Sequence, residues 1–265
     1  TGNSRNYIDS HKTKTGMKSI LKILASLLLL VATSANISAQ KDAEKEYFDL
    51  LMMYLDGDFE KMLKKADKYM DSDKTGKDPL PYLYASMAYF DISKNEELAQ
   101  DYKNPLRESL KLASKFVRYD REKKYADEGD EFLAKLRAEV KQAALAEIAD
   151  DKGSRADYYF KQLLRLDEND YSIIYMQMQQ AIREGDTYSS NELRQQFNQM
   201  TALVSEWIKE PQDKLDFLAY SMLQHAEFLF EKGRSDAANK VLAELAQYVG
   251  NENQQLKEFK IQRGL

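Results

Sequence analysis

The stretch that decides the fold is residues 220–246, which read YSMLQHAEFLFEKGRSDAANKVLAELA. Large apolar residues recur every three or four positions on both sides of Gly233, which is the spacing of one face of an α-helix. Two small residues, Ala226 and Ala238, stand where they would let two helices approach closely. Gly233 can adopt the left-handed conformation that a tight turn requires. We therefore predict a pair of packed helices in this stretch.

This helix pair resembles the tetratricopeptide repeat, a unit of two helices that recurs about every 34 residues. Weaker copies of the pattern start near Tyr47, Tyr82 and Ile174. The resemblance implies an all-α fold, a tetratricopeptide-like α-solenoid of about five antiparallel helix pairs. The large, small and turn positions of the best copy are Met222, His225, Ala226, Leu229, Gly233, Ala238, Leu242 and Leu245.

The chain also departs from that family in two respects. Ala66, Ala113 and Phe160 occupy one repeat position at intervals of 47 residues, which is longer than the usual period. Glu168 and Gly250 stand where a proline normally ends the unit. We therefore expect longer helix pairs than usual. Another α–α repeat or an irregular helical bundle is the alternative architecture.

Helical periodicity extends over nearly the whole chain, and no stretch shows the sustained alternation of a half-buried strand. A stripe from Leu193 through Phe197 to Trp207 predicts one continuous helix, and Ser189 with Glu192 would form a capping box ahead of it. The helices predicted in this way span residues 42–55, 58–71, 80–93, 105–120, 130–150, 154–167, 171–184, 190–209, 213–232, 234–248 and 253–261.

Residues 17–39 have the order of a secretory signal peptide. Met17 opens a short basic stretch, the apolar run 23–32 follows, and small and polar residues lead to Ala39 and Gln40. This run of ten residues, interrupted only by Ser26, is too short to span a bilayer, for which about 20 apolar residues are needed. We therefore predict cleavage near Ala39-Gln40, with a retained N-terminal anchor as the alternative. A Gln directly after the cut resembles secreted proteins of the Bacteroidota.

This leader sets the expected layout and compartment of the protein. Residues 1–16 are interpreted as an upstream extension that is not native, and residues 40–265 as a single tetratricopeptide-like domain without an integral membrane span. That mature part would be periplasmic or otherwise secreted. The sequence has no Cys, so it can form no disulfide, Cys-ligated zinc site or thiol nucleophile. Stability in that compartment must come from packing alone, which a chain of this length can provide.

The composition also limits the partners. Residues 40–265 carry a net charge of −9, because residues 1–39 hold five Lys or Arg and one Asp. Binding to nucleic acid depends on a basic stripe that neutralises phosphates, so we expect no nucleic-acid partner. With only 10 Gly and 4 Pro, the chain is also a poor candidate for a turn-rich β-sandwich or barrel.

The sequence offers few groups for catalysis. His11 precedes the leader, so the mature chain holds only His225, at a core position of the last repeat. A catalytic triad or a His-rich metal site needs partners that are missing, so we interpret His225 as a packing residue. The motifs of phosphate loops, nucleophile elbows and zinc hydrolases are absent. We therefore predict a non-enzymatic protein with no catalytic residue, no cofactor and no metal.

An acidic cluster surrounds Gly129. Paired carboxylates could serve glycoside hydrolysis or bind calcium. The cluster lacks the residue order of a calcium loop and stands at a predicted helix start, where acids interact favourably with the helix dipole. We favour this structural interpretation. The four acids are Asp127, Glu128, Asp130 and Glu131.

The function expected from these features is a periplasmic scaffold or adaptor for protein–protein interaction. In the tetratricopeptide family, the first helix of each pair lines a concave surface. We expect this surface to bind an envelope protein or peptide. A glycan- or nutrient-binding accessory protein of the cell envelope is the alternative, although it would favour a pair of Trp residues and a lipid-anchoring Cys, neither of which is present. An enzyme with an unrecognised acid pair is a third possibility. The register places these residues on the concave surface: Tyr175, Gln179 and Arg183 in one repeat, and Tyr220, Glu227 and Glu231 in the last.

Overall fold

The computed structural model describes residues 47–150 and 152–265, and within these ranges every regular element is helical. The prediction of an all-α fold is confirmed for this part of the chain. The predicted leader and upstream extension, residues 1–39, lie outside the described residues. No helix in the described ranges combines the length and the apolar character needed to cross a membrane.

Most helix bounds agree with the predicted ones within a few residues, α11 excepted, and a short additional helix, α6, lies between α5 and α7. The elements are α3 (Phe48–Leu55), α4 (Phe59–Met70), α5 (Pro79–Lys94), α6 (Glu96–Ala99), α7 (Pro105–Tyr119), α8 (Ala126–Ala149), α9 (Gly153–Leu166), α10 (Tyr171–Glu184), α11 (Thr187–Thr201), the 3₁₀ turn η1 (Trp207–Lys209), α12 (Gln212–Glu231), α13 (Ser235–Val249) and α14 (Gln254–Arg263).

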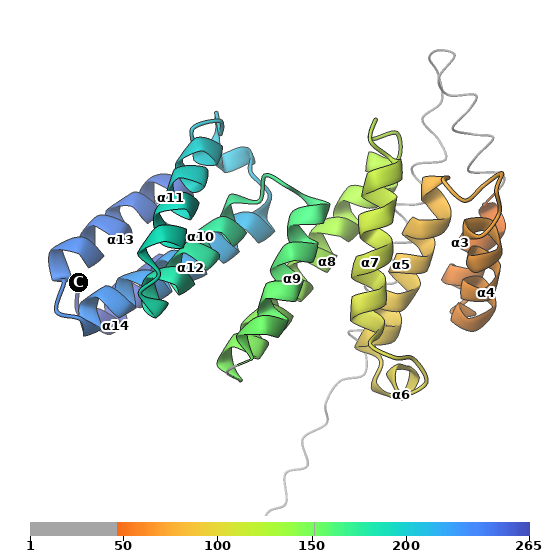
Figure 1. The fold of residues 1–265 in the computed structure, drawn as a ribbon, viewed down its shortest axis with the longest axis horizontal. Coiled ribbons are helices and arrows are strands. Elements are labelled where there is room, and N and C mark those ends of the chain that lie inside the picture. Colours follow the sequence, from red (N-terminus) through yellow and green to blue (C-terminus); the bar gives the residue numbers. More distant parts are fainter. Residues whose placement is uncertain (1–46, 151) are drawn as a thin grey trace, which may run out of the picture. The chain divides into compact units, whose positions relative to one another are not determined.

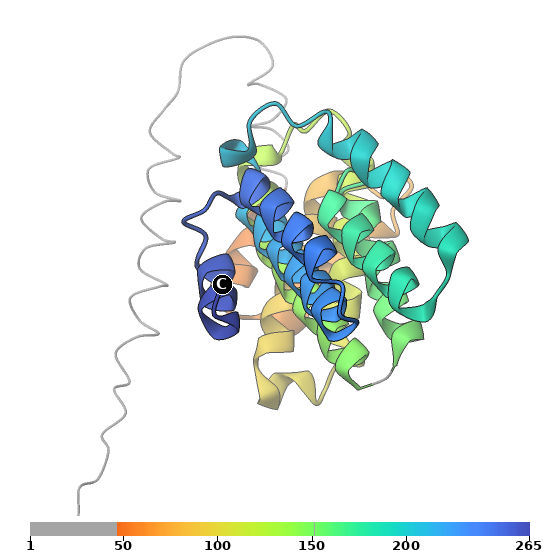
Figure 2. The same cartoon turned by 90° about the vertical axis from the view of Figure 1, so that its left-hand side faces the viewer.

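Helices that follow one another in the chain pack as pairs (Figure 1). The pairs are α3 with α4, α5 with α7, α8 with α9, α10 with α11, and α12 with α13. First helices of neighbouring pairs also contact each other in three cases, α3 with α5, α5 with α8 and α10 with α12, and α8 contacts α12. The last helix, α14, lies beside α12 (Figure 2).

The start of α11 differs from the predicted capping box. The helix begins at Thr187, and its N-cap is Asp186, whose carboxylate accepts a hydrogen bond from the backbone amide of Ser189 at 3.0 Å. Ser189 therefore lies inside the first turn and is not the cap. Asp is as effective an N-cap as Ser, and its position directly after Gly185 places the boundary three residues earlier than predicted.

The end of the helix predicted over 190–209 is also wrong. α11 ends at Thr201, and Trp207 lies in the separate turn η1. The indole ring packs against the rings of Tyr171 and Tyr248, with centroid distances of 5.3 and 4.5 Å. These tertiary contacts replace the continuous helix that the apolar stripe predicted.

The pair formed by α12 and α13 has the close contact that its small residues predicted. Ala226 and Ala238 both have 0% exposed surface and belong to one apolar core with Leu229 and Leu242. Gly233, in the turn between the helices, has a φ of +69°, in the left-handed region.

We expect Ala238→Leu to lower the free energy of unfolding by roughly 1–3 kcal/mol, because the larger side chain overpacks the helix contact. The measurement is urea unfolding followed by circular dichroism. Ala146 is exposed on α8, so Ala146→Leu makes the same chemical change without overpacking and should leave stability nearly unchanged. Equal stability of the two variants would contradict the packing of α12 against α13.

Candidate functional site

A groove of about 650 Å³ lies between α8 and α12, and we call it the α8–α12 groove. It lies between helices that belong to different pairs, and α5 and α14 each provide one further lining residue. Its lining residues are Phe90 from α5, Lys135, Ala138, Glu139, Lys141, Gln142 and Leu145 from α8, Asp213, Asp216, Phe217 and Tyr220 from α12, and Gln255 from α14.

Two aromatic rings of α12 form an apolar part of the groove wall. Phe217 and Tyr220 stack with a centroid distance of 6.4 Å and an interplanar angle of 22°. Phe217 is buried, whereas Tyr220 keeps 36% of its surface exposed. The supported ring of Tyr220 therefore offers an apolar face and a hydroxyl to whatever enters the groove.

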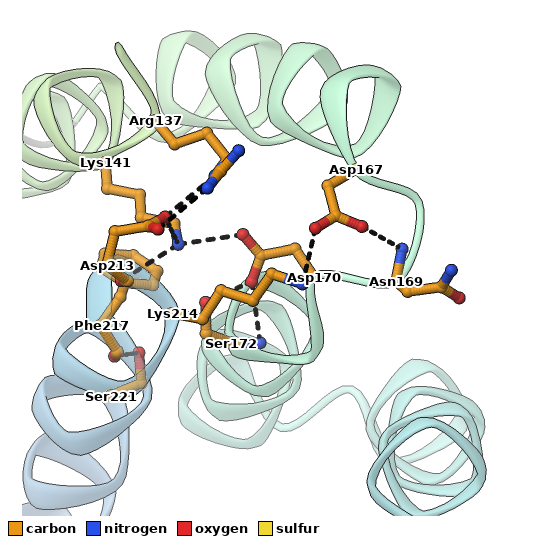
Figure 3. Close-up of polar contacts among 10 residues, drawn as sticks. All are labelled: Arg137, Lys141, Asp167, Asn169, Asp170, Ser172, Asp213, Lys214, Phe217 and Ser221. Atoms are coloured by element: carbon orange, nitrogen blue, oxygen red, sulfur yellow. Dashed lines mark hydrogen bonds and ion pairs between the residues drawn. The ribbon is translucent and has the colours of Figure 1, made fainter. Parts of the chain in front are cut away.

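Buried charges lie at the floor of the groove, where α8 meets the first turn of α12 (Figure 3). Arg137 holds Asp213 with two hydrogen bonds, from Nε to Oδ2 and from Nη2 to Oδ1, both 3.0 Å long. Lys141, one turn further along α8, places its Nζ 3.2 Å from Asp213 Oδ2 and 2.9 Å from Asp170 Oδ2. The side chains of Lys141 and Asp170 are 2% and 0% exposed, so these charges are removed from solvent.

Asp170 connects this cluster to the start of α10. It is the N-cap of that helix, and its Oδ1 accepts a hydrogen bond from the backbone amide of Ser172 at 3.1 Å. Its Oδ2 accepts no hydrogen bond within the described residues and depends on the Lys141 ammonium for compensation. Three residues earlier, Asp167 forms an ion pair with Lys214 at 2.5 Å.

These six residues, Arg137, Lys141, Asp167, Asp170, Asp213 and Lys214, are here named the ion network. The network contains three acids and three bases, so its formal charge is zero. Two of its acids lie at helix N-termini, Asp170 on α10 and Asp213 on α12, where the helix dipole favours a negative charge. The helix dipoles thus stabilise the same two carboxylates with which Arg137 and Lys141 of α8 pair.

The pKa of Asp213 indicates that this carboxyl is ionised at neutral pH. Burial by itself would raise the pKa of this carboxyl, but the hydrogen bonds from Arg137 and the charge of Lys141 outweigh it and hold the pKa below its ordinary value. A carboxylate that is fully engaged in this way is a poor proton acceptor, so the floor is not arranged for acid–base chemistry.

The structure separates the six residues that the sequence placed on one concave surface. Tyr220 lines the groove. Tyr175 and Gln179, each 3% exposed, are buried, so the prediction that they present a binding surface is wrong. The physical reason is that α10 is covered by both α11 and α12, so fewer of its faces reach solvent than the repeat register assumed.

The other three predicted residues lie outside the groove lining: Arg183 near the C-terminal end of α10, and Glu227 and Glu231 toward that of α12. Arg183 donates a hydrogen bond from Nη2 to the backbone carbonyl of Gln224 at 3.3 Å. Glu227 accepts a hydrogen bond from Arg263 of α14 at 2.9 Å, and Glu231 is exposed. Arg183 and Glu227 therefore already bind neighbouring helices.

His225 is buried, as the sequence predicted. Its Nδ1 lies 2.8 Å from the hydroxyl of Tyr175, and the imidazole is 5% exposed. Burial, followed by the positive charges of Arg194, Arg234 and Arg183, lowers its pKa to about 4. A neutral, enclosed imidazole of this kind stabilises the core contact between α10 and α12 and has no access to a substrate.

The predicted acidic helix start is also found, because Asp127 and Glu128 lie in the first turn of α8. Gly129 is needed for close packing there, since a Cβ at this position would lie 2.7 Å from the ring of Phe116. Among the described residues, no group of three or more His, Asp or Glu side chains is placed to hold a metal ion.

A second hollow, of about 520 Å³, lies where the turn between α3 and α4 faces α6. Its acids Asp58 and Glu60 are exposed and form ion pairs with Lys61 and Lys64 on the same helix. Exposed pairs of this type contribute little binding energy. This hollow also has aromatic rings in its lining, Phe59 and Tyr102, but it lacks the buried ion pairs of the α8–α12 groove, which is therefore the better candidate site.

Comparison of the chain with known protein families, with curated proteins and with solved structures gives no match. The functional argument rests on the groove itself.

Proposed function

We propose that this protein is a non-enzymatic scaffold of the cell envelope that binds a protein or peptide segment in the α8–α12 groove. The successive helix pairs support an arrangement like that of a tetratricopeptide α-solenoid, in which first helices of neighbouring pairs face a ligand. The signal-peptide pattern of residues 17–39 supports a periplasmic or otherwise secreted location.

The observation that carries this proposal is the composition of the groove. Its wall presents the aromatic ring of Tyr220 beside aliphatic groups such as Leu145, and its rim carries Lys135, Glu139 and Asp216. Aromatic anchors surrounded by charges are characteristic of protein interfaces. The charges at the floor are paired with one another, which leaves them committed to the fold and favours binding over catalysis.

The alternative of a glycan-binding accessory protein receives less support. The sequence contains one Trp, Trp207, and its ring packs between Tyr171 and Tyr248. The pair of Trp rings that would favour this alternative is absent, and the single indole is partly buried against the two tyrosines.

The proposal predicts that Tyr220→Ala weakens the capture of the partner by about 2 kcal/mol, or roughly 30-fold in Kd, while the chain stays folded. The partner is first identified with a photo-crosslinking amino acid at position 220, using envelope fractions of the native host. Tyr188 lies on α11 and is 80% exposed, so the same amino acid at position 188 reports background crosslinking. Binding of the identified partner is then measured for purified wild type, Tyr220→Ala and Tyr188→Ala.

The expected result is a product that forms at position 220 and not at 188, with weaker binding of Tyr220→Ala alone. Equal crosslinking at the two positions, or unchanged affinity of a folded Tyr220→Ala variant, would contradict the groove as the binding site.

A further inference from the structure

The helices on the two sides of the ion network do not share one apolar core. The buried members of the C-terminal core all lie between Tyr171 and Leu256, on α10 to α14. Neither α8 nor α9 contributes a buried member, and Leu164 of α9 is their one partly buried residue packed against this core. Helices α10 to α14, here called the C-terminal body, are therefore held together by their own packing.

The contact between α8 and the C-terminal body contains buried ion pairs. Arg137 and Lys141 provide the ion pairs described above, and Lys141 Nζ lies 5.3 Å from the centre of the Phe217 ring. The ring of Phe160 on α9 lies 6.4 Å from that of Phe217. The helices thus contact each other less across this boundary, through α12 with α8 and α10 with α9, than α10 and α12 do within the body.

The energetics of such a boundary differ from those of an apolar contact. Separating apolar surfaces loses about 25 cal/mol for every Å² that returns to water. Separating buried ions loses their mutual attraction but recovers their hydration, and the two free energies are of similar size. A joint built from ion pairs can therefore have closed and open arrangements of comparable free energy, as a conformational switch requires.

The chain connection is suited to such a motion. Only residues 167–170 join α9 to α10, and Asp167 has an extended backbone with φ −150° and ψ 100°. Hinges usually consist of a few residues at the ends of elements. The α8–α12 groove has α8 on one side of this boundary and α12 and α14 on the other, so a rotation at the joint changes its width.

We propose that the ion network is a hinge about which the C-terminal body turns against α8 and α9, and that this rotation opens and closes the α8–α12 groove. The hinge does not depend on what the groove binds, so it can hold even if the proposed partner binding fails.

The absence of Cys from the sequence allows two spin labels to be placed without removing native thiols. Lys161 on α9 and Asn239 on α13 are exposed, and Lys161→Cys with Asn239→Cys places labels across the joint. Asn191→Cys with Asn239→Cys places both labels within the C-terminal body and is the control. Distances between labels are measured by pulsed electron resonance in the full chain.

Two variants of the joint have opposite expected effects. Arg137→Gln with Lys141→Gln leaves two buried acids without cations, so the ratio of open to closed distances across the joint should rise by roughly tenfold. An apolar joint, made by Arg137→Met, Lys141→Met, Asp170→Ser and Asp213→Leu, should lower that ratio and narrow the distribution, because opening now exposes apolar surface. Ser at position 170 retains an N-cap for α10.

The control distance within the C-terminal body should be narrow and equal in wild type and both variants. If the double Gln variant does not fold, the distribution of its control distance broadens. The hinge is then tested by comparing the distances across the joint in the apolar variant and in wild type. The same distribution across the joint in wild type and every folded variant would overturn the hinge.

Discussion

Tyr175→Ala should lower the free energy of unfolding by roughly 3–5 kcal/mol, the range observed when a large buried aromatic side chain is truncated. The ring is 3% exposed and packs edge to face against Phe197, with a centroid distance of 5.0 Å. Truncation would leave a cavity between α10 and α11. It would also remove the hydroxyl that lies 2.8 Å from His225 Nδ1, leaving a buried polar atom without its partner. Urea unfolding followed by circular dichroism measures the loss.

Two further Tyr variants give this measurement its controls. Tyr175→Phe keeps the ring and removes only the hydroxyl, so it should cost about 1–2 kcal/mol. Tyr188 is 80% exposed, and Tyr188→Ala should change stability by less than about 0.5 kcal/mol. If Tyr175→Ala were as stable as Tyr188→Ala, Tyr175 would have to be a surface residue, as the repeat register had placed it.

The helices could be predicted from the sequence because their signals are local. The period of three to four residues and the small residues Ala226 and Ala238 depend only on neighbours along the chain. Which face a helix buries depends also on residues that are distant in the sequence. α10 carries apolar or aromatic residues around much of its circumference, including Ile173, Ile174 and Tyr175, so its periodicity alone does not select a surface. Tyr175 is buried because both α11 and α12 pack against α10.

The groove could be predicted only in part. Tyr220 follows from the register of α12, whereas the ion network joins residues that are distant in sequence, such as Arg137 and Asp213, which are 76 positions apart. A local signal was nevertheless present, because Lys141 directly follows the core residue Val140 in an apolar stripe. A charge at the edge of such a stripe is usually solvated, so pattern reasoning gave no cause to seek a buried partner.

The stability of the protein should fall on acidification, and His225 should account for much of the fall between about pH 6.5 and pH 4. The pKa of His225 is lowered from the ordinary 6.5 to about 4, first by burial and then by the positive charges of Arg194, Arg234 and Arg183. In this pH range the unfolded chain binds a proton that the folded protein does not. Stability is therefore complete above the unfolded pKa and decreases as the pH falls toward the folded pKa.

The size of this loss follows from the difference between the two pKa values. One pKa unit corresponds to about 1.4 kcal/mol, so the contribution of His225 should decrease by roughly 3 kcal/mol between pH 7 and pH 4. The measurement is the free energy of unfolding in urea at a series of pH values. His225→Gln is the matched variant, because it removes the titrating group and keeps a polar side chain near the Tyr175 hydroxyl.

Other groups also titrate in this range, and the comparison with His225→Gln removes their effect. Burial raises the pKa of Asp67 and of Asp91, so these two carboxyls bind protons more readily in the folded protein and oppose the loss. Their contribution is the same in wild type and in His225→Gln, since they lie on α4 and α5 and neither is among the groups that interact with the imidazole. We expect the variant to be less stable at pH 7, where the hydrogen bond to Tyr175 is altered, and to lose less stability toward pH 4. Parallel curves for the two proteins would mean that His225 is hydrated in the folded state, in conflict with its burial between α10 and α12.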